Sequence, residues 1–327
     1  MLPPAMLPPK DRLTICFAHA AYQMKTIFDA MNTGIASFEV RDRAELDRRA
    51  PEADVIVASG MWHNGLVPLA PRLRFVQSIS SGTDQYDRAL LAGRGIRLAS
   101  AAGVNARAVA EHAIGLMLAL TRRLPEARDN QAVRHWRPMI GDLTRREDEL
   151  GGKTVLIIGL GRIGGRLARL ARAFDMTVVG FRADVSRGAG EANEVHGLAA
   201  LPAHLPRADF VVLTCPLTPE TRGVISAAAL GLMRPSAFLV NVARGGCVNQ
   251  DALLAALAAG RIAGAALDTT DPEPPDATSP LWSMPNVLLT PHTAGETRQY
   301  EANVIEILLE NLERLWRGET ELRNQVM

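Results

Sequence analysis

Residues 155–184 constrain the fold of this chain more than any other stretch, and they read VLIIGLGRIGGRLARLARAFDMTVVGFRAD. The four apolar residues at 155–158 form a run that is too short for a helix and ends at glycine, which is typical of a strand buried on both faces. Apolar residues then recur at helical spacing over 167–174, and a second short strand is expected at 177–181. The stretch therefore predicts a strand, a glycine turn, a helix and a strand, which together make one βαβ unit.

The turn of this unit carries the pattern GxGxxG at Gly159, Gly161 and Gly164. In a βαβ unit the first glycine permits a tight turn, the second lets a pyrophosphate approach the backbone, and the third lets helix and strand pack closely. The phosphates would lie on the free N–H groups at the helix N-terminus. The pattern alone is weak, because glycine turns between strands and helices are common. Inside a βαβ unit it predicts a dinucleotide site.

Composition favours two domains and gives no support to several functional classes. The 327 residues are too many for one compact core. The 36 basic and 35 acidic residues are well mixed and give a net charge of +1, so we expect neither a nucleic-acid nor a membrane partner. Three widely spaced cysteines without a CxxC pair predict neither a disulfide framework nor a zinc site, and no metal is expected.

Residues 1–9 repeat MLPP and lack a basic segment followed by an apolar one, so they make a poor signal peptide. We expect them to form a flexible tail. The longest apolar stretch, 113–120, is far shorter than a membrane span. A cytoplasmic location is therefore expected.

Strand-like and helix-like stretches alternate on both sides of the βαβ unit, which predicts a small parallel sheet before it and a larger one around it. The further strands are expected at 13–17, 38–40, 55–58, 75–79, 210–213, 238–241, 263–267 and 287–289. The second sheet would then have about six strands, as in a dinucleotide-binding sheet built from two mononucleotide halves. A helix at 106–124 is apolar around most of its circumference and must be buried, either between domains or against another subunit.

Three ionisable side chains, Arg244, Glu273 and His292, follow three of these strands. Each has a structural explanation of its own, since the arginine could cap a turn, the glutamate could be a solvated loop charge, and the histidine could be hydrogen-bonded within its loop. Ligands of an open α/β sheet bind beyond the carboxyl ends of the strands, where a nicotinamide would lie. The occurrence of all three at this edge favours a catalytic set.

Reduction of a 2-keto acid by hydride transfer needs the chemistry of such a set. The guanidinium of Arg244 has a fork of donors and a permanent charge, which suit a carboxylate and a polarised carbonyl oxygen. A histidine such as His292 exchanges protons near neutral pH and can protonate that oxygen. A neighbouring carboxylate, here Glu273, favours the protonated ring and fixes its orientation.

The sequence resembles the D-isomer-specific 2-hydroxyacid dehydrogenase family from about Leu73 to Asn311. The resemblance is carried by IIGLGRIGGRLA at 157–168, LTCPLTPETRGVI at 213–225, NVARGGCVN at 241–249, ALDTTDPEP at 266–274 and LTPHTAG at 289–295. It implies NAD(P)-dependent interconversion of a 2-keto acid and a D-2-hydroxy acid, with glyoxylate and hydroxypyruvate among the fitting substrates. It also implies that Arg244, Glu273 and His292 are the catalytic residues.

The resemblance implies an α/β fold with two domains and a cleft between them. A Rossmann domain that binds NAD(P) is expected at 105–296, and a flavodoxin-like substrate domain at 10–104 and 297–327. Beyond the glycine turn, the residues implied for the coenzyme are Arg162, Ile163, Thr214, Cys215, Pro216, Thr221, Val242, Ala243, Arg244, Asp268, His292, Ala294 and Gly295. Those implied for the substrate are Ser80, Ser81, Gly82, Arg244 and His292.

Two positions depart from the family's pattern. Arg182 stands at the end of the second strand of the βαβ unit, where an acidic residue usually accepts hydrogen bonds from the ribose. A guanidinium there can bind a 2′-phosphate, so we expect NADP(H) rather than NAD(H), although Asp184 could still reach the ribose. The loop at 59–64 carries a Trp62–His63 pair, and the tryptophan either packs at a domain edge or contacts the substrate.

Two expectations concern other molecules. The broad apolar face of the helix at 106–124, together with the resemblance, predicts a homodimer. A coenzyme-sensing interaction protein of the corepressor type shares the fold and the motifs, and it is the alternative to an enzyme. Such proteins use basic arms or long disordered extensions, which we do not find in this sequence.

Overall fold

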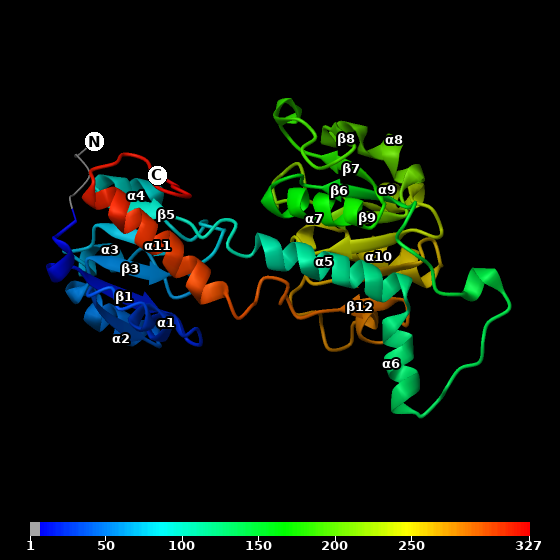
Figure 1. Ribbon diagram of the computed structural model, residues 1–327, viewed down its shortest axis with the longest axis horizontal. Coiled ribbons are helices and arrows are strands. Elements are labelled where there is room, and N and C mark those ends of the chain that lie inside the picture. The colour runs from blue at the N-terminus through cyan, green and yellow to red at the C-terminus, as the bar shows by residue number, and fades with distance from the viewer. Residues whose placement is uncertain (1–6) are drawn as a thin grey trace. The chain divides into compact units, whose positions relative to one another are not determined.

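The computed structural model describes residues 7–327 (Figure 1). The described chain divides into two compact units. One comprises the residues up to Asn105 together with Thr297–Met327, and the other comprises Ala106–Glu296. The sequence placed these boundaries at 104/105 and 296/297. No helix among the described residues is both long enough and apolar enough to cross a membrane.

The first unit is built on a five-stranded parallel sheet in the order β2-β1-β3-β4-β5. Its strands are β1 Thr14–Ala18, β2 Ala36–Val40, β3 Val55–Ala58, β4 Phe75–Ser78 and β5 Arg97–Ala99. Its helices are α1 Met24–Ala30, α2 Arg43–Arg49, α3 Leu66–Leu69, α4 Arg88–Gly93 and α11 Tyr300–Trp316. Successive residues of the strands face opposite sides, so Ile15 and Val55 join one apolar cluster while Cys16 and Ile56 join the other.

The second unit is built on a seven-stranded parallel sheet in the order β12-β11-β10-β9-β6-β7-β8. Its strands are β6 Thr154–Ile158, β7 Thr177–Phe181, β8 Glu194–His196, β9 Phe210–Leu213, β10 Phe238–Asn241, β11 Gly264–Leu267 and β12 Val287–Leu289. Its helices are α5 Ala106–Thr121, α6 Leu124–Ala132, α7 Arg162–Ala173, α8 Leu201–His204, α9 Ala227–Leu232 and α10 Gln250–Ala258. The two parallel sheets confirm the α/β fold with a Rossmann domain.

The edge strand β8 is a correction to the expected count of about six strands. Its three residues read EVH, so it has no apolar run by which the sequence could reveal it. β8 pairs with β7 and aligns His196 with Phe181.

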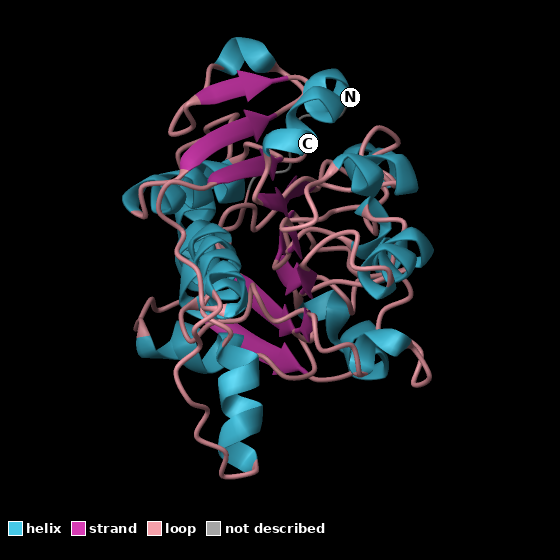
Figure 2. Cartoon of the chain, turned by 90° about the vertical axis from the view of Figure 1, so that its right-hand side faces the viewer, coloured by secondary structure: helices cyan, strands magenta, loops and turns pink. Residues whose placement is uncertain are grey.

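Helices cover both faces of the seven-stranded sheet (Figures 1 and 2). Apolar residues of α5 and α7 share a buried cluster with Val155 and Ile157 of β6. Apolar residues of α8, α9 and α10 share the cluster of the opposite face with Leu156 and Ile158. A strand with alternate residues in two clusters is buried on both faces, as the apolar run at 155–158 predicted.

The expected helix at 106–124 is interrupted. α5 ends at Thr121, and Arg123 has a left-handed backbone with φ of +50° before α6 begins at Leu124. Pro125 in the first turn of α6 suits a helix start, because a proline inside a continuous helix would remove a backbone hydrogen bond. α6 and the loop after it extend away from the rest of their unit (Figures 1 and 2).

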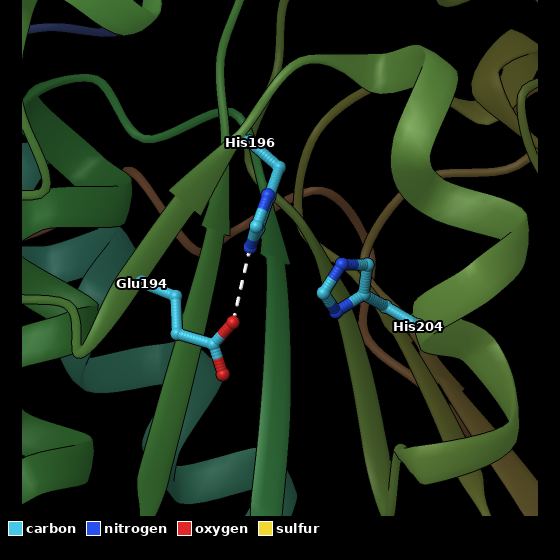
Figure 3. A group of neighbouring side chains, drawn as sticks. All are labelled: Glu194, His196 and His204. Carbon is cyan, nitrogen blue, oxygen red and sulfur yellow. Dashed lines mark hydrogen bonds and ion pairs between the residues drawn. The ribbon is translucent and has the colours of Figure 1, made fainter.

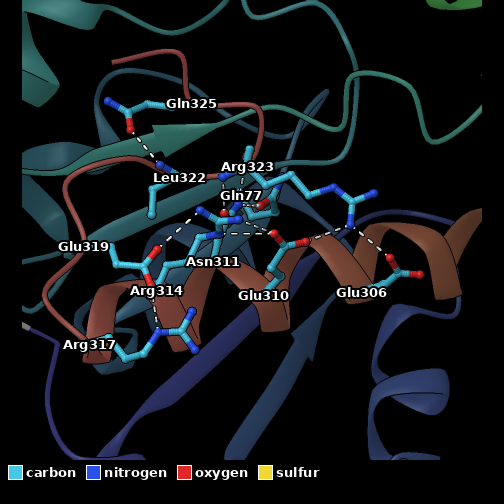
Figure 4. A network of polar contacts seen from close by, with 10 residues as sticks. All are labelled: Gln77, Glu306, Glu310, Asn311, Arg314, Arg317, Glu319, Leu322, Arg323 and Gln325. Atoms are coloured by element: carbon cyan, nitrogen blue, oxygen red, sulfur yellow. Dashed lines mark hydrogen bonds and ion pairs between the residues drawn. The ribbon is translucent and has the colours of Figure 1, made fainter.

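The C-terminal residues return to the first unit through a polar network (Figure 4). Asn311 is fully buried, and its side chain donates to Gln77 Oε1 and to the Arg323 carbonyl while accepting from the Arg323 N–H. The guanidinium of Arg323 bridges Glu306 and Glu310 at 2.9 Å each. Gln77 lies on β4, so this network ties α11 and the terminal segment to the sheet.

The predicted flexible tail at 1–9 needs a partial correction. Residues 1–6 lie outside the described residues. Leu7 is buried in the apolar cluster that includes residues of α11, and the Pro8 carbonyl accepts a hydrogen bond of 2.9 Å from Trp316 Nε1. Leu7 and Pro8 therefore pack against the first unit, whereas Pro9 is exposed.

Candidate active site

The strands of the seven-stranded sheet end level with one another, and this register assembles the site. Ile158 aligns with Phe181 on one side and with Leu213 on the other. Leu213 aligns with Asn241, and Leu267 aligns with both Asn241 and Leu289. The residues that follow β6, β7, β9, β10, β11 and β12 therefore all lie at one edge of the sheet, the edge where open α/β sheets bind ligands.

Gly159, in the turn after β6, and Gly164, in the first turn of α7, occupy positions that no other residue fits. Gly159 has φ of +107°, and a Cβ there would lie 2.5 Å from the backbone nitrogen of Cys215. A Cβ on Gly164 would lie 2.2 Å from the Gly159 carbonyl oxygen. The turn, the start of α7 and the end of β9 therefore pack closely. The N-terminus of a helix favours an anion, and α7 begins at this turn.

A cavity of about 540 Å³ opens beside this turn. Its size lies in the range of small-molecule and cofactor sites. Seven residues that the sequence implies for the coenzyme line it, namely Gly159, Gly161, Arg182, Thr214, Cys215, Pro216 and Thr221. The Thr221 hydroxyl ties the 214–221 segment together by donating to the Pro216 carbonyl at 2.7 Å and accepting from the Thr218 N–H at 2.7 Å.

The remaining residues implied for the coenzyme do not line this cavity. Arg162, Ile163 and Gly164 lie in the first turn of α7. Val242, Ala243 and Arg244 follow β10, Asp268 follows β11, and His292, Ala294 and Gly295 follow β12. Of these ten residues, Gly164, Val242, Ala243, Asp268 and Ala294 are buried.

Two arginines and an aspartate after β7 form one wall of the cavity. Arg182, Asp184 and Arg187 all line it. The Asp184 carboxylate accepts from the N–H of Ser186 at 3.1 Å and from its hydroxyl at 2.5 Å, and the hydroxyl hydrogen bond is the main reason that the pKa of Asp184 is lowered. One Nη atom of Arg182 donates to the Gly188 carbonyl at 3.1 Å, which leaves the rest of its fork of donors for other acceptors.

His292 and Glu273 lie together after β12 and β11. The Nδ1 atom of His292 is 2.6 Å from Glu273 Oε1, and both side chains are almost half exposed. His292 has φ of +55°, and its N–H donates to the Thr290 carbonyl at 3.0 Å. Because Nδ1 faces the carboxylate, Nε2 is the ring nitrogen left for a substrate.

Arg244 is exposed at the end of the neighbouring strand, β10. The side chain of Asn241 fixes its backbone by donating to the Arg244 carbonyl and accepting from the Ala243 N–H, each at 3.0 Å. A Cβ on Gly245 would lie 1.9 Å from the Thr270 carbonyl oxygen, so the Arg244 turn packs directly against the segment that leads to Glu273.

Asp268 has contacts that the sequence did not reveal. Its buried carboxylate accepts from Thr290 Oγ1 at 2.6 Å and from the N–H groups of Thr293 and Ala294 at 3.0 and 3.1 Å. His112 of α5 places Nε2 3.0 Å from Thr290 Oγ1 and 3.6 Å from Asp268 Oδ1. These contacts hold the 290–294 turn that presents His292. Sequence reasoning missed His112, because a single histidine on an apolar helix carries no motif.

Ser80, Ser81 and Gly82 follow β4 at the carboxyl edge of the five-stranded sheet. The Ser80 hydroxyl is 2.7 Å from that of Ser59 and donates to the Gly82 carbonyl at 2.9 Å. The side chain of Ser80 thus stabilises the loop.

Trp62 belongs to the interior of the first unit, whereas His63 beside it is partly exposed. Trp62 is buried against Tyr86, with ring centroids 5.1 Å apart, and its Nε1 donates to Asn64 Oδ1 at 3.1 Å. His63 places Nε2 2.7 Å from Asp47 of α2. Of the two interpretations left open for Trp62, the structure favours packing.

Known proteins resemble this chain in sequence. Residues 114–294 match the model of the D-isomer-specific 2-hydroxyacid dehydrogenase NAD-binding domain. A D-3-phosphoglycerate dehydrogenase of Methanocaldococcus jannaschii is 34% identical over 280 residues, which cover 85% of this chain and 52% of the relative. A glyoxylate reductase of Thermofilum pendens is 37% identical over 256 residues, which cover 76% of this chain and 74% of the relative.

A solved structure of the same family resembles the chain in fold. A solved structure of a D-isomer-specific 2-hydroxyacid dehydrogenase family protein from Aeromonas salmonicida superposes with a TM-score of 0.83 at 27% identity and covers 97% of this chain and 99% of its own. The matched region spans about half the length of the phosphoglycerate dehydrogenases of Methanocaldococcus jannaschii and Archaeoglobus fulgidus. The chain belongs to the D-isomer-specific 2-hydroxyacid dehydrogenase family.

Proposed function

We propose that this protein is an NAD(P)-dependent oxidoreductase that interconverts a small 2-keto acid, such as glyoxylate or hydroxypyruvate, and the corresponding D-2-hydroxy acid. The observation that carries the proposal is the His292–Glu273 contact of 2.6 Å, on the same sheet edge as Arg244. Bound beside it, a nicotinamide coenzyme would supply or accept the hydride at the substrate carbon.

The residues around the glycine turn fit such a coenzyme. The turn is a cradle that a Cβ at Gly159 or Gly164 would fill, and it lies at the start of α7. Its backbone N–H groups would hold the pyrophosphate, and the apolar wall of Phe181, Leu198 and Pro216 would take the adenine.

The chain's own residues then have distinct tasks. The guanidinium of Arg244 would bind the substrate carboxylate and polarise the carbonyl oxygen. His292 would give a proton from Nε2 to that oxygen during reduction and take it back during oxidation. Glu273 would hold the ring through Nδ1 and stabilise its protonated form. The backbone of 80–82 is proposed to bind the substrate carboxylate as well.

Turnover with glyoxylate, hydroxypyruvate and phenylpyruvate tests the proposal directly. His292→Ala should lower kcat by about 10²- to 10⁴-fold, while coenzyme still binds, because a general acid acts in the transition state. Arg244→Ala should impair both KM and kcat. Coenzyme binding without turnover of any 2-keto acid would instead favour the coenzyme-sensing interaction protein, and near-normal activity of His292→Ala would refute the catalytic assignment.

We propose that NADP(H) is the preferred coenzyme. Arg182 and Arg187 both line the cavity, and the Oδ1 atom of Asp184, which also lines it, is engaged by Ser186. The measurement is the ratio of kcat/KM with NADPH to that with NADH, for the native protein and for Arg182→Asp. A native ratio below one, or a ratio that the substitution leaves unchanged, would show that Arg182 does not bind the 2′-phosphate.

We also propose a homodimer, at a surface other than the expected helix at 106–124. The apolar face of α5 was the reason to expect dimerisation through that helix, but Val109, Ala113 and Met117 are buried inside their own unit. Large apolar side chains are exposed instead on the extension after α6, where Trp136 is 96% and Met139 98% exposed. Light scattering should give twice the mass of the 35.3 kDa chain, and Trp136→Ser with Met139→Ser should reduce it to that of one chain.

A further inference from the structure

A second group of ligand-type side chains lies at the far edge of the seven-stranded sheet, outside the site described above. Glu194 and His196 alternate along β8 and therefore point to the same face, and His204 ends α8 above that face. One ligand atom from each of the three lies within 4.8 Å of the other two. Figure 3 shows the three side chains directed into one space between β8 and α8.

Two of the three side chains are already paired in a way that leaves ligand atoms available. His196 Nε2 is 3.0 Å from Glu194 Oε2. Arg207 donates to the other carboxylate oxygen, Oε1, at 3.1 Å. A metal ion can therefore replace the proton between Oε2 and Nε2 while Arg207 keeps its own contact.

The third side chain lacks a partner. The Nδ1 atom of His204 is buried and forms no hydrogen bond within residues 7–327. Its ring packs edge-on against Phe181 and lies 4.3 Å from the His196 ring, centroid to centroid, so packing holds it toward the other two ligands. A buried polar atom without a partner is costly and points to a missing ligand.

We propose that Glu194, His196 and His204 bind one zinc ion, with water completing the coordination. Two imidazole nitrogens and one carboxylate oxygen form a known protein donor set for Zn²⁺. Mg²⁺ and Ca²⁺ are poor alternatives, because they prefer sites made of oxygen ligands alone. Ligand atoms of a tetrahedral zinc site lie about 3.3 Å apart, given bonds of about 2.0 Å. Small side-chain rotations would bring the three ligand atoms, which now lie within 4.8 Å of one another, to this distance.

Such an ion would join the edge strand to the helix that follows it. β8 is only three residues long, and it pairs with β7 alone, so a ligand shared with α8 would fix both elements to the sheet. None of the three ligands lines the coenzyme cavity, which makes this site independent of the proposed function. The spacing E-x-H with a histidine eight residues later matches no metal motif, which is why the sequence predicted no metal.

The test uses the full-length protein without a polyhistidine tag, stripped with EDTA and titrated calorimetrically with ZnCl₂ at pH 7.5. At this pH an ordinary histidine, with a pKa of about 6.5, is mostly neutral and free to ligate. One ion per chain should bind, and equivalent MgCl₂ should not. Loss of a second-shell group costs about 10- to 100-fold in metal affinity, so His204→Gln, which removes a direct ligand, should weaken zinc binding by at least about 100-fold.

Two further measurements keep the test decisive. Glu194→Gln retains a hydrogen-bonding side chain beside His196 but removes the negative charge, and it should also weaken binding, whereas His135→Gln at an exposed position should not. Co²⁺ added to the native protein should give visible absorption bands of a tetrahedral ion that Zn²⁺ displaces. Absence of stoichiometric binding by the native protein, or equal affinity in the native and His204→Gln proteins, would overturn the proposal.

Discussion

Replacing Gly164 with alanine should separate α7 from the turn after β6, whereas the same change at the next residue should be harmless. A Cβ on Gly164 would lie 2.2 Å from the Gly159 carbonyl oxygen, and ordinary contact begins near 3.4 Å, so the backbone must move by 3.4 − 2.2 = 1.2 Å. The nearest atoms also include Thr214 Oγ1 at 2.9 Å. A Cβ on Gly165 meets nothing within 4 Å.

These geometries predict effects of opposite sign on stability. Overpacking of this kind costs roughly 1–3 kcal/mol, which lowers the thermal midpoint of a unit of this size by about 2–12 °C. Gly165→Ala places alanine in a partly exposed helical position and should add about 0.5–1 kcal/mol, or roughly 1–4 °C. Differential scanning calorimetry of the two variants beside the native protein measures both shifts.

The same displacement should impair coenzyme binding. A shift of 1.2 Å would break at least one N–H···phosphate hydrogen bond at the start of α7, and a hydrogen bond to a charged group contributes about 1.5–3 kcal/mol. The Kd for NADPH should therefore rise at least about tenfold in Gly164→Ala and stay unchanged in Gly165→Ala. Fluorescence titration measures it. A Gly164→Ala protein with native stability and native Kd would refute the role given to this close contact.

Three further predictions concern contacts outside the glycine turn. Asp268→Asn removes the charge that anchors the 290–294 turn and should lower kcat by about 10²-fold through misplacement of His292, whereas the exposed control Asp276→Asn should have native kinetics. Trp62→Ala should destabilise the protein by about 3–5 kcal/mol in urea unfolding, and Trp62→Phe by only about 1 kcal/mol, with KM unchanged in the latter if the tryptophan packs rather than binds substrate. Burial, assisted by the charge of Arg41, lowers the pKa of His19. The neutral ring accepts hydrogen bonds at Nδ1 from the N–H groups of Ala21 and Tyr22. The stabilisation by His19 is therefore complete above about pH 6.5 and is lost as the pH falls through the lowered pKa. His19→Gln should therefore flatten the fall in thermal midpoint below pH 6.5, and an unchanged slope would contradict this account.

The parts of the fold that the sequence predicted are those with local patterns. The apolar run at 155–158, the glycine spacing behind it and the helical period of 167–174 lie within thirty residues, and each pattern is set by the geometry of one element. Ranges predicted for 210–213, 238–241 and 287–289 coincide with β9, β10 and β12. β9 and β10 are almost entirely buried, and strands buried on both faces are continuous apolar runs.

The features that escaped prediction depend on tertiary contacts or on single residues. β8 is polar at two of its three positions and exists because it pairs with β7. The expected helix is broken at Arg123, whose backbone is left-handed. Few residues other than glycine adopt this conformation, so an arginine gives no indication of it in the sequence. The role of Trp62 was ambiguous because a tryptophan suits both a binding loop and a core. Its contact with Tyr86 favours the core.

The contacts that hold His292 in place show why the residues of a site can be predicted from the sequence while its supporting contacts are missed. Arg244, Glu273 and His292 could be assigned from the sequence, because parallel strands bring residues after their carboxyl ends to one edge. The turn that presents His292 depends on Asp268, which is 22 residues before Thr290, and on His112, which is 178 residues before it. The hydrogen bonds of Asp268 and His112 follow no period or spacing in the sequence. The buried carboxylate of Asp268 nevertheless requires them, because a charge inside the protein is stable only with hydrogen-bond donors around it. The residues assigned to the proposed chemistry thus follow predicted strands and can be found from the sequence, whereas the contacts that hold His292 in place become visible only in the structure.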